Sequence, residues 1–169
     1  MDTKRRYELE AIEYIAKIAD GGLRDAITLM DKCLSYSEQL TLENVVKALG
    51  TVDYNVMIQL TDTLTNNEPK EMIGIIEEIH NSGKDIKQFL KNYMQFLLDV
   101  NKWQVGCDWK YLGIPKLEEY EEWIKKADAN KCWKLLDVVV KLNSQIKYSQ
   151  TPKYDIEAEL MLFAGGEEE

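Results

Sequence analysis

The chain has 169 residues, of which 45% are hydrophobic and 30% are charged, and its formal net charge is −9. This composition is typical of a folded globular protein and excludes a disordered chain, and no apolar run reaches the roughly 20 residues that span a bilayer. The negative charge argues against direct nucleic-acid contact, because phosphate binding needs clustered basic side chains. The polar N-terminal segment lacks the apolar core of a secretory signal. We therefore expect a cytoplasmic protein without membrane contact.

Helical periodicity covers almost the whole chain, and no segment alternates as a strand would. The first predicted helix covers about residues 7–20 and the second about residues 23–36. Gly21 and Gly22 separate them, because glycine tolerates the left-handed turn that ends a helix. The residues predicted to face inward are Ile12, Ile15, Ala16 and Ala19 in the first helix and Leu23, Ile27, Met30 and Leu34 in the second.

A short third helix is predicted to follow the N-cap Thr41 and to end at Gly50, with Val45, Val46 and Leu49 facing inward. The segment 51–53 is then predicted to be a hinge between two helical bundles. The sequence therefore predicts a small bundle over residues 1–50.

A larger helical bundle is predicted for residues 51–166, and its longest helix, 85–104, has a broad apolar face and is expected to be central. Residues 106–115 are expected to be irregular, and 167–169 form an acidic tail. The fold class is therefore all-α. The other helices predicted in this bundle are one that Asp53 caps and that runs to Leu64, one over 69–81 with Pro69 in its first turn, and ones over 118–126 and 130–149, with a last one after Pro152.

Residue types that carry catalysis are scarce in this chain. There is no Gly-x₄-Gly-Lys-Ser/Thr loop for nucleotide phosphates, and His80 is the single histidine. His80 is expected to be a surface or capping residue, because a general base needs a positioned partner. The glutamates in 118–122 are expected to be superficial. We predict no catalytic residue and no metal site: the three cysteines, Cys33, Cys107 and Cys132, are expected to be reduced thiols, and the four tryptophans, Trp103, Trp109, Trp123 and Trp133, to pack in the core.

Arg24 is the exception, because it lies in the first turn of the second predicted helix, where the helix dipole favours an anion. A guanidinium there offers a rigid, always-charged fork that suits phosphate oxygens. The alternative is an ion pair with Asp20 or Asp25, which is a common surface arrangement of little energetic weight. Local chemistry favours the ion pair.

The segment around Arg24 resembles the bacterial DNA polymerase III gamma/tau family of clamp-loader AAA+ ATPases. In that family a helix ending in Ile-Ala and small residues is followed by Gly-Gly-Leu-Arg-Asp-Ala, then by a Leu-Thr helix start and a Leu-Gly-Thr-Val-Asp junction. The matching elements here occur in the same order. They are Ile15-Ala16 to Gly22, Leu23 to Asp31, Leu40-Thr41, and Leu49 to Asp53.

The resemblance implies that residues 1–50 are the C-terminal part of the ATPase lid domain and that 51–166 are the collar domain that holds the subunits together. It gives Arg24 the role of the sensor-2 arginine, which contacts the γ-phosphate of ATP. The phosphate-binding core has no counterpart here, so we expect a fragment that is not an enzyme alone. ATP and Mg²⁺ are then cofactors of the parent only. In that reading the collar contacts other clamp-loader subunits, and the missing core contacts the sliding clamp and primed DNA.

Two other readings stay open on the sequence. One is a free-standing helical interaction module with no nucleotide role, and the other is a related AAA+ protein of recombination. The collar reading also predicts concentration-dependent self-association, because a detached collar exposes an apolar face.

Overall fold

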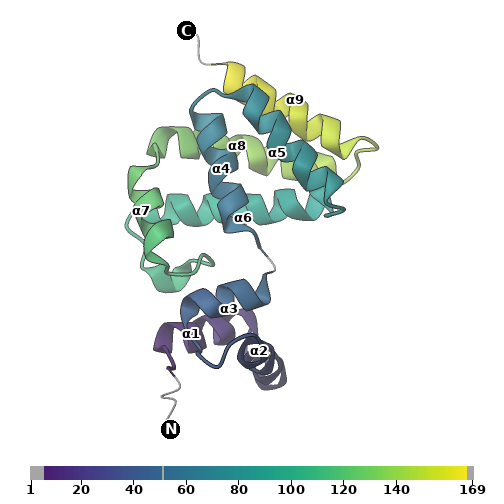
Figure 1. Ribbon diagram of the computed structural model, residues 1–169. Coiled ribbons are helices and arrows are strands. Elements are labelled where there is room, and N and C mark those ends of the chain that lie inside the picture. The colour runs from purple at the N-terminus through teal and green to yellow at the C-terminus, as the bar shows by residue number, and fades with distance from the viewer. Residues whose placement is uncertain (1–5, 51, 167–169) are drawn as a thin grey trace. The chain divides into compact units, whose positions relative to one another are not determined.

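The computed structural model describes residues 6–50 and 52–166, and in these residues the chain is all-α, as the sequence predicts (Figure 1). The pairing that comes nearest to a strand there is an isolated bridge between Tyr7 and Leu40. Three parts of the predicted organisation lie outside the described residues. They are the polar start 1–5, the hinge residue Thr51 and the acidic tail 167–169.

Two compact units make up the chain. The smaller unit comprises the residues up to Val52 together with Pro115–Glu122, and the larger unit comprises Asp53–Ile114 and the residues from Trp123 onward.

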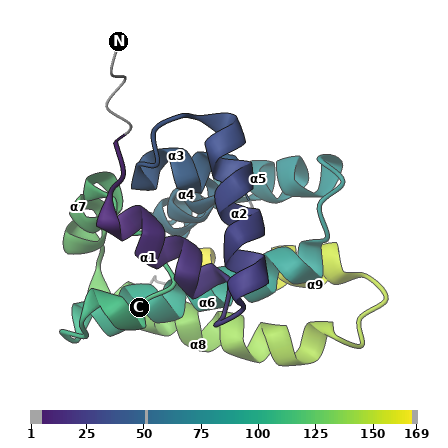
Figure 2. The same ribbon diagram turned by 90° about the horizontal axis from the view of Figure 1, so that it is seen from below.

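The smaller unit contains the helices α1 (Leu9–Ile18), α2 (Leu23–Tyr36) and α3 (Leu42–Leu49), which pack around one small core (Figure 2). Both helix ends predicted for α3 are confirmed. The Thr41 hydroxyl accepts a hydrogen bond from the Asn44 N–H at 3.2 Å, and Gly50 ends the helix with φ of 50°. The buried core consists of Ala11, Ile15, Cys33, Leu40, Leu42, Val45 and Leu49.

The prediction for the first helix was partly wrong. Residues 6–8 are extended, because the Glu8 N–H donates to the Leu40 carbonyl at 3.0 Å and the Leu40 N–H donates to the Arg6 carbonyl at 2.9 Å. The buried face of α1 is Ala11, Ile15 and Ala19, whereas Ile12 and Ala16 are exposed.

The inward face of α2 was also predicted wrongly at its N-terminal end, because Leu23 is 76% exposed and Ile27 is 53% exposed. The helix carries two adjoining apolar stripes, and the helices α1 and α3 cover the one that contains Cys33. Periodicity identifies both stripes but does not say which one meets the core.

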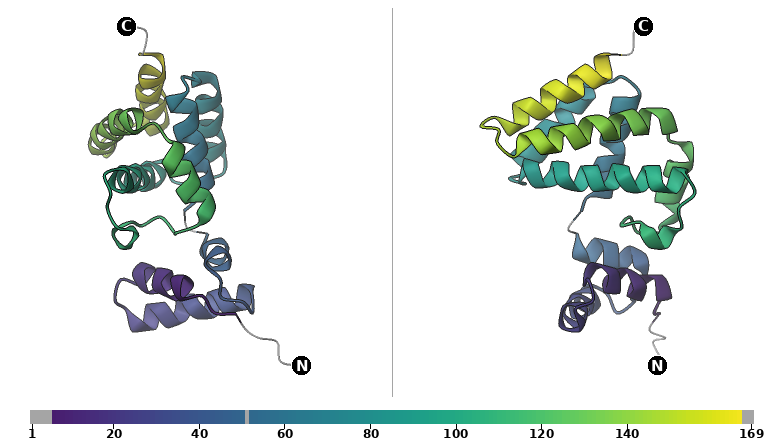
Figure 3. Two further views of the ribbon diagram at one scale, coloured as in Figure 1. Left: turned by 90° about the vertical axis from the view of Figure 1, so that its left-hand side faces the viewer. Right: turned by 180° about the vertical axis from the view of Figure 1, so that it is seen from behind.

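The larger unit contains six helices in the described residues, and α6 is central as predicted. It packs most extensively against α8 and also contacts α4 and α9. Figure 3 shows α9, α8 and α6 in that order side by side. The helices are α4 (Tyr54–Thr65), α5 (Pro69–Asn81), α6 (Ile86–Gln104), α7 (Glu118–Lys126, which begins in the smaller unit), α8 (Ala129–Ile146) and α9 (Pro152–Gly165), and a 3-10 turn, η1, covers Trp109–Tyr111.

Capping side chains fix where these helices begin. Asp53 accepts from the Val56 N–H as predicted, Asp85 accepts from the N–H groups of Lys87 and Gln88, and Asp128 accepts from the Lys131 N–H. Asp128 starts α8 at Ala129, one residue before the predicted start. The C-terminal end was wrong by three residues, because α8 ends at Ile146 and the predicted end was Ser149.

Core packing is confirmed only in part for the tryptophans. Three are partly buried, and the Trp123 indole donates to an Asp62 carboxylate oxygen at 2.9 Å. Trp133 contradicts the prediction, because it is 52% exposed on α8. A search of the residues described by the structure finds no helix long and apolar enough to cross a membrane.

Candidate functional site

The turn between α1 and α2 positions the predicted site. The chain reverses direction through two successive left-handed residues, Asp20 with φ of 48° and Gly21 with φ of 80°. The Gly22 N–H then donates to the Ala19 carbonyl at 2.9 Å, and the Gly22 carbonyl accepts the first bond of α2 from Ala26, also at 2.9 Å. This turn fixes where α2 begins.

A side chain at the N-cap residue Gly22 would be crowded by its neighbours. A Cβ at this position would lie 2.8 Å from a carboxylate oxygen of Asp25 and 3.2 Å from the Ala19 carbonyl oxygen. Glycine also brings no side-chain oxygen to cap the helix. The first N–H groups of α2 therefore have no N-cap side chain as acceptor, which is a property of helix starts that bind anions.

Arg24 is the second residue of α2, and its side chain is exposed. Within the described part of the chain, no ion pair joins its guanidinium to a carboxylate, so neither Asp20 nor Asp25 pairs with it. The ion-pair alternative is therefore wrong for this structure. The sensor role itself stays a prediction.

The other predicted residues are not brought together into a site. His80 lies exposed in the last turn of α5, and Cys33, Cys107 and Cys132 form no disulfide. No group of three or more metal-ligating side chains occurs among the residues with described positions. Burial raises the pKa of the Cys33 thiol and raises that of the Cys132 thiol to about 11, so both are held as inert neutral thiols.

Sequence reasoning missed a set of exposed apolar side chains on the larger unit. Leu98 on α6, Trp133 and Val140 on α8, and Met161 and Leu162 on α9 are each between 41% and 70% exposed. Apolar residues on the outer side of a helix carry no separate signal in the sequence, because periodicity places them in the same pattern as the core.

The described chain is thus all-α, with an arginine at a helix start that has no N-cap side chain and a helical bundle that carries exposed apolar side chains. Comparison with known families identifies its family. Residues 2–39 match the model of the DNA polymerase III clamp loader subunit, ATPase lid domain, and residues 40–163 match that of DNA polymerase III subunits gamma and tau domain III. The chain therefore belongs to the DNA polymerase III gamma and tau subunit family.

Curated relatives agree with this family. The tau subunit of DNA polymerase III from Bacillus subtilis is 23% identical over 146 residues, which are 85% of this chain and 26% of that protein. The gamma/tau subunit from Mycoplasma genitalium is 27% identical over 100 residues, 58% of this chain and 16% of that protein. The gamma subunit from Buchnera aphidicola of Acyrthosiphon pisum is 21% identical over 157 residues, 89% of this chain and 43% of that protein. The chain thus spans less than half the length of each of these relatives.

Three boundaries lie close together along the chain. The two family models meet between residues 39 and 40, and the two compact units divide after Val52. The predicted domain boundary lies between them, after residue 50, and it stays a prediction.

Proposed function

We propose that this chain is the lid and collar part of a clamp-loader subunit, and that it helps to assemble the ATP-driven complex that loads the sliding clamp onto primed DNA. The observation that carries this proposal is the order of the two family matches, since a lid model and a domain III model follow one another without a gap.

Arg24 is the residue through which the chain takes part in nucleotide recognition in this proposal. Two structural observations support it: the first turn of α2 has no N-cap side chain, and the guanidinium is exposed without a paired carboxylate. Arg24 would hold the γ-phosphate of ATP, whose hydrolysis, assisted by Mg²⁺, supplies the chemistry in the parent. The sequence has no Gly-x₄-Gly-Lys-Ser/Thr loop, so ATP and Mg²⁺ belong to the parent and this chain alone is not an enzyme.

The larger unit supplies the contacts to other clamp-loader subunits in this proposal, and its exposed apolar side chains on α6, α8 and α9 support that role. The sliding clamp and primed DNA are then contacted by the ATPase core of the parent.

Replacement of Arg24 by Ala in the parent subunit tests the nucleotide role. The fold should be unchanged, because the side chain is exposed, and clamp- and DNA-stimulated ATP turnover should fall by about tenfold or more, since a cation on the γ-phosphate stabilises the transition state. Lys32→Ala is the matched control, because Lys32 is an exposed cation on the same helix. Turnover that Arg24→Ala leaves at the level of Lys32→Ala would refute the sensor assignment.

Arg24→Lys separates this proposal from the free-standing interaction module. The planar guanidinium of Arg24 can donate two hydrogen bonds to a phosphate, and a lysine ammonium does not reproduce that geometry. The ATP turnover of Arg24→Lys should therefore stay well below the wild-type rate. An interaction module with no nucleotide role tolerates the same change without cost.

A further inference from the structure

Charge is segregated among the helices of this acidic protein. α6 and α8 each contain three lysines and one aspartate, which gives each a formal charge of +2. Every other α-helix in the described residues is neutral or negative, and α5, α7 and α9 each carry −2 with histidine counted as neutral. The two positive helices pack directly against one another, so their charges add up within the larger unit.

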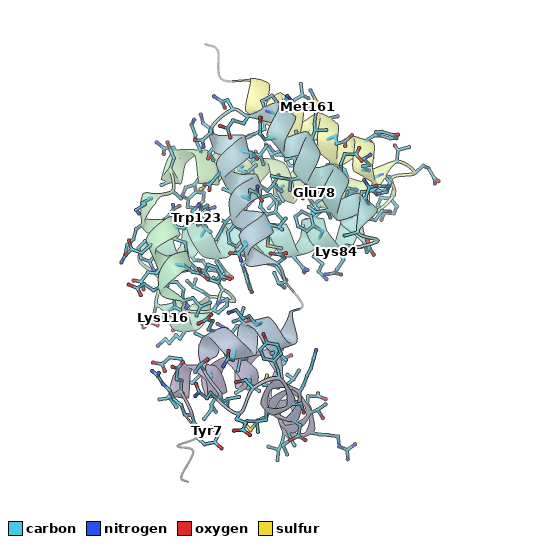
Figure 4. All side chains as sticks on the ribbon, in the orientation of Figure 1. Tyr7, Glu78, Lys84, Lys116, Trp123 and Met161 are labelled. Carbon is cyan, nitrogen blue, oxygen red and sulfur yellow. The ribbon has the colours of Figure 1, made fainter. Side chains whose placement is uncertain are left out.

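Four lysines gather at one end of this positive helix pair. Lys84, labelled in Figure 4, lies in the turn between α5 and α6, and Lys87 and Lys91 follow on the first two turns of α6. Lys147 is the first residue after α8. The Lys87 ammonium group brings the start of α6 and the end of α8 together, because it donates to the carbonyl oxygens of Lys147 and Ser149, each at 3.4 Å.

The charges of these lysines are not neutralised within the fold. Lys84, Lys91 and Lys147 are exposed, and none of them forms an ion pair with a carboxylate of the described residues. Asp85 caps α6 by accepting from two backbone N–H groups, and Asp155 accepts from the hydroxyl of a serine in the turn after α8. Residues 84–91 and 147–151 contain four lysines and one aspartate, so they carry an excess of three positive charges.

Tyr148 adds an aromatic ring to the lysines. It directly follows Lys147 and is 87% exposed, which makes it the most exposed large apolar or aromatic side chain of the described residues. A ring with so little contact to its own fold contributes little to the packing of the protein. Its flat face is therefore available to a ligand that stacks.

Ammonium groups beside an exposed aromatic ring suit a single strand of DNA. Clustered lysines bind phosphates, and an unpaired base stacks on an aromatic side chain, which is how proteins bind single strands without sequence preference. A protein partner fits less well, because lysine is depleted in protein interfaces. Duplex DNA would meet the lysines, but its bases are stacked on one another and do not reach the Tyr148 ring.

We propose that a single strand of DNA binds to this group of four lysines and one tyrosine. We call it the turn cluster, and its members are Lys84, Lys87, Lys91, Lys147 and Tyr148. The inference goes beyond the proposed function, which assigns DNA contact to the ATPase core of the parent, and it rests on that function only for the choice of DNA over RNA. The net charge of −9 is an average over the chain, and the turn cluster is a local exception to it.

Fluorescence anisotropy tests the proposal with the 169-residue chain and a labelled oligothymidylate. An oligomer of about 20 nucleotides in about 50 mM salt should bind with a Kd between about 1 and about 100 μM. The logarithm of the binding constant should fall against the logarithm of the salt concentration with a slope of about −2 to −3, because about three or four phosphates are neutralised.

The lysine variant is Lys91→Glu with Lys147→Glu, and it should bind the oligomer at least about tenfold more weakly than the wild-type chain. The charge-matched control is Lys70→Glu with Lys126→Glu. These two lysines are exposed on α5 and α7, outside the turn cluster. Because both variants change the net charge equally, only a local site makes them differ, and the control should bind as the wild-type chain does.

Tyr148→Ala tests the stacking contact separately. Its affinity should fall at least about fivefold with an unchanged salt slope, because the ring carries no charge, and Tyr148→Trp should bind as tightly as the wild-type chain. Tyr36→Ala is the matched control, because it removes a tyrosine that is 57% exposed at the end of α2. Circular dichroism checks that each variant is folded.

Four results would overturn the proposal. One is a wild-type chain that does not bind the oligomer at about 200 μM in about 50 mM salt. Another is a lysine variant or a Tyr148→Ala variant that binds as tightly as its control. A third is a Tyr148→Ala variant that binds more weakly only through a changed salt slope. The last is polyglutamate that displaces the labelled oligomer as well as unlabelled oligothymidylate does at equal charge, because the turn cluster would then be a site for acidic proteins.

Failure here is distinguishable from failure of the proposed function. A chain that binds no single strand disproves the turn cluster and leaves the clamp-loader assignment intact. The ATP turnover of Arg24→Ala in the parent tests a residue of the smaller unit, whereas the turn cluster belongs to the larger unit.

Discussion

Tyr93 and Thr61 form a polar contact at the centre of the larger unit. Both are almost fully buried, and their hydroxyl oxygens lie 2.9 Å apart. The Thr61 hydroxyl donates to the Met57 carbonyl at 2.8 Å, so the Tyr93 hydroxyl is the donor to Thr61. Burial raises the pKa of Tyr93 well above its usual range, which keeps the ring neutral. The two hydroxyls are therefore not equivalent. The Tyr93 hydroxyl needs Thr61 as its acceptor, whereas the Thr61 hydroxyl donates to Met57 and does not need Tyr93.

Thr61→Val should therefore cost more than Tyr93→Phe. The valine removes the acceptor that the described residues provide for the buried Tyr93 hydroxyl, at a cost of about 1–3 kcal/mol, whereas the phenylalanine leaves Thr61 bonded to Met57. Urea unfolding of both single variants and the double variant measures this. The double variant should recover part of the loss of Thr61→Val. Equal costs for the two single variants would contradict the assignment of donor and acceptor.

Ionisation of the Cys132 thiol makes the free energy of unfolding depend on pH in the alkaline range. Burial is the main cause that raises its pKa to about 11, and the nearby Asp128 charge adds to it. A raised folded pKa means that the unfolded thiol loses its proton first, at about pH 8.5, so stability is complete below that pH and falls as pH rises toward 11. Urea unfolding at several pH values from about 8 to about 10 should show this fall, with a limiting slope of about 1.4 kcal/mol per pH unit from this thiol. Cys132→Ala should reduce the slope, and an unchanged slope would show that other groups cause it.

At the scale of single helices, the ends were more predictable than the faces. Thr41, Asp53, Pro69 and Gly50 were recognisable because a cap, a proline or a left-handed glycine acts on its own neighbours. The inward sides of α1 and α2 were not, because which apolar stripe is covered depends on helices far along the chain. For the same reason the exposed Trp133 could not be told from a core residue.

The start of α6 is also fixed by a capping side chain close to it in sequence. Asp85 accepts from two backbone N–H groups, those of Lys87 at 2.9 Å and Gln88 at 3.3 Å. Asp85→Ala should cost about 1 kcal/mol in the free energy of unfolding, and Asp85→Asn should cost little, because asparagine is an equally good N-cap. Thermal unfolding followed by circular dichroism measures both variants. An alanine variant as stable as the asparagine variant would show that the cap does not stabilise α6.

At the scale of the whole molecule, the site could be placed from the sequence only through the glycine turn. Gly21, Gly22 and Arg24 are adjacent, so their geometry is local, and the structure shows the left-handed turn and the exposed guanidinium that it produces. The net charge of −9 could not indicate that α6 and α8 are both positive neighbours, because a sum over the chain conceals how charge is distributed in space.

The sequence of the coding DNA upstream of Met1 tests whether this chain works as part of a clamp-loader ATPase subunit, as we propose. An in-frame upstream segment that encodes Gly-x₄-Gly-Lys-Ser/Thr is the predicted result, because it would supply the phosphate-binding loop that Arg24 needs. A stop codon and a ribosome-binding site directly before Met1 would contradict the account, because the chain would then be made without a nucleotide site of its own.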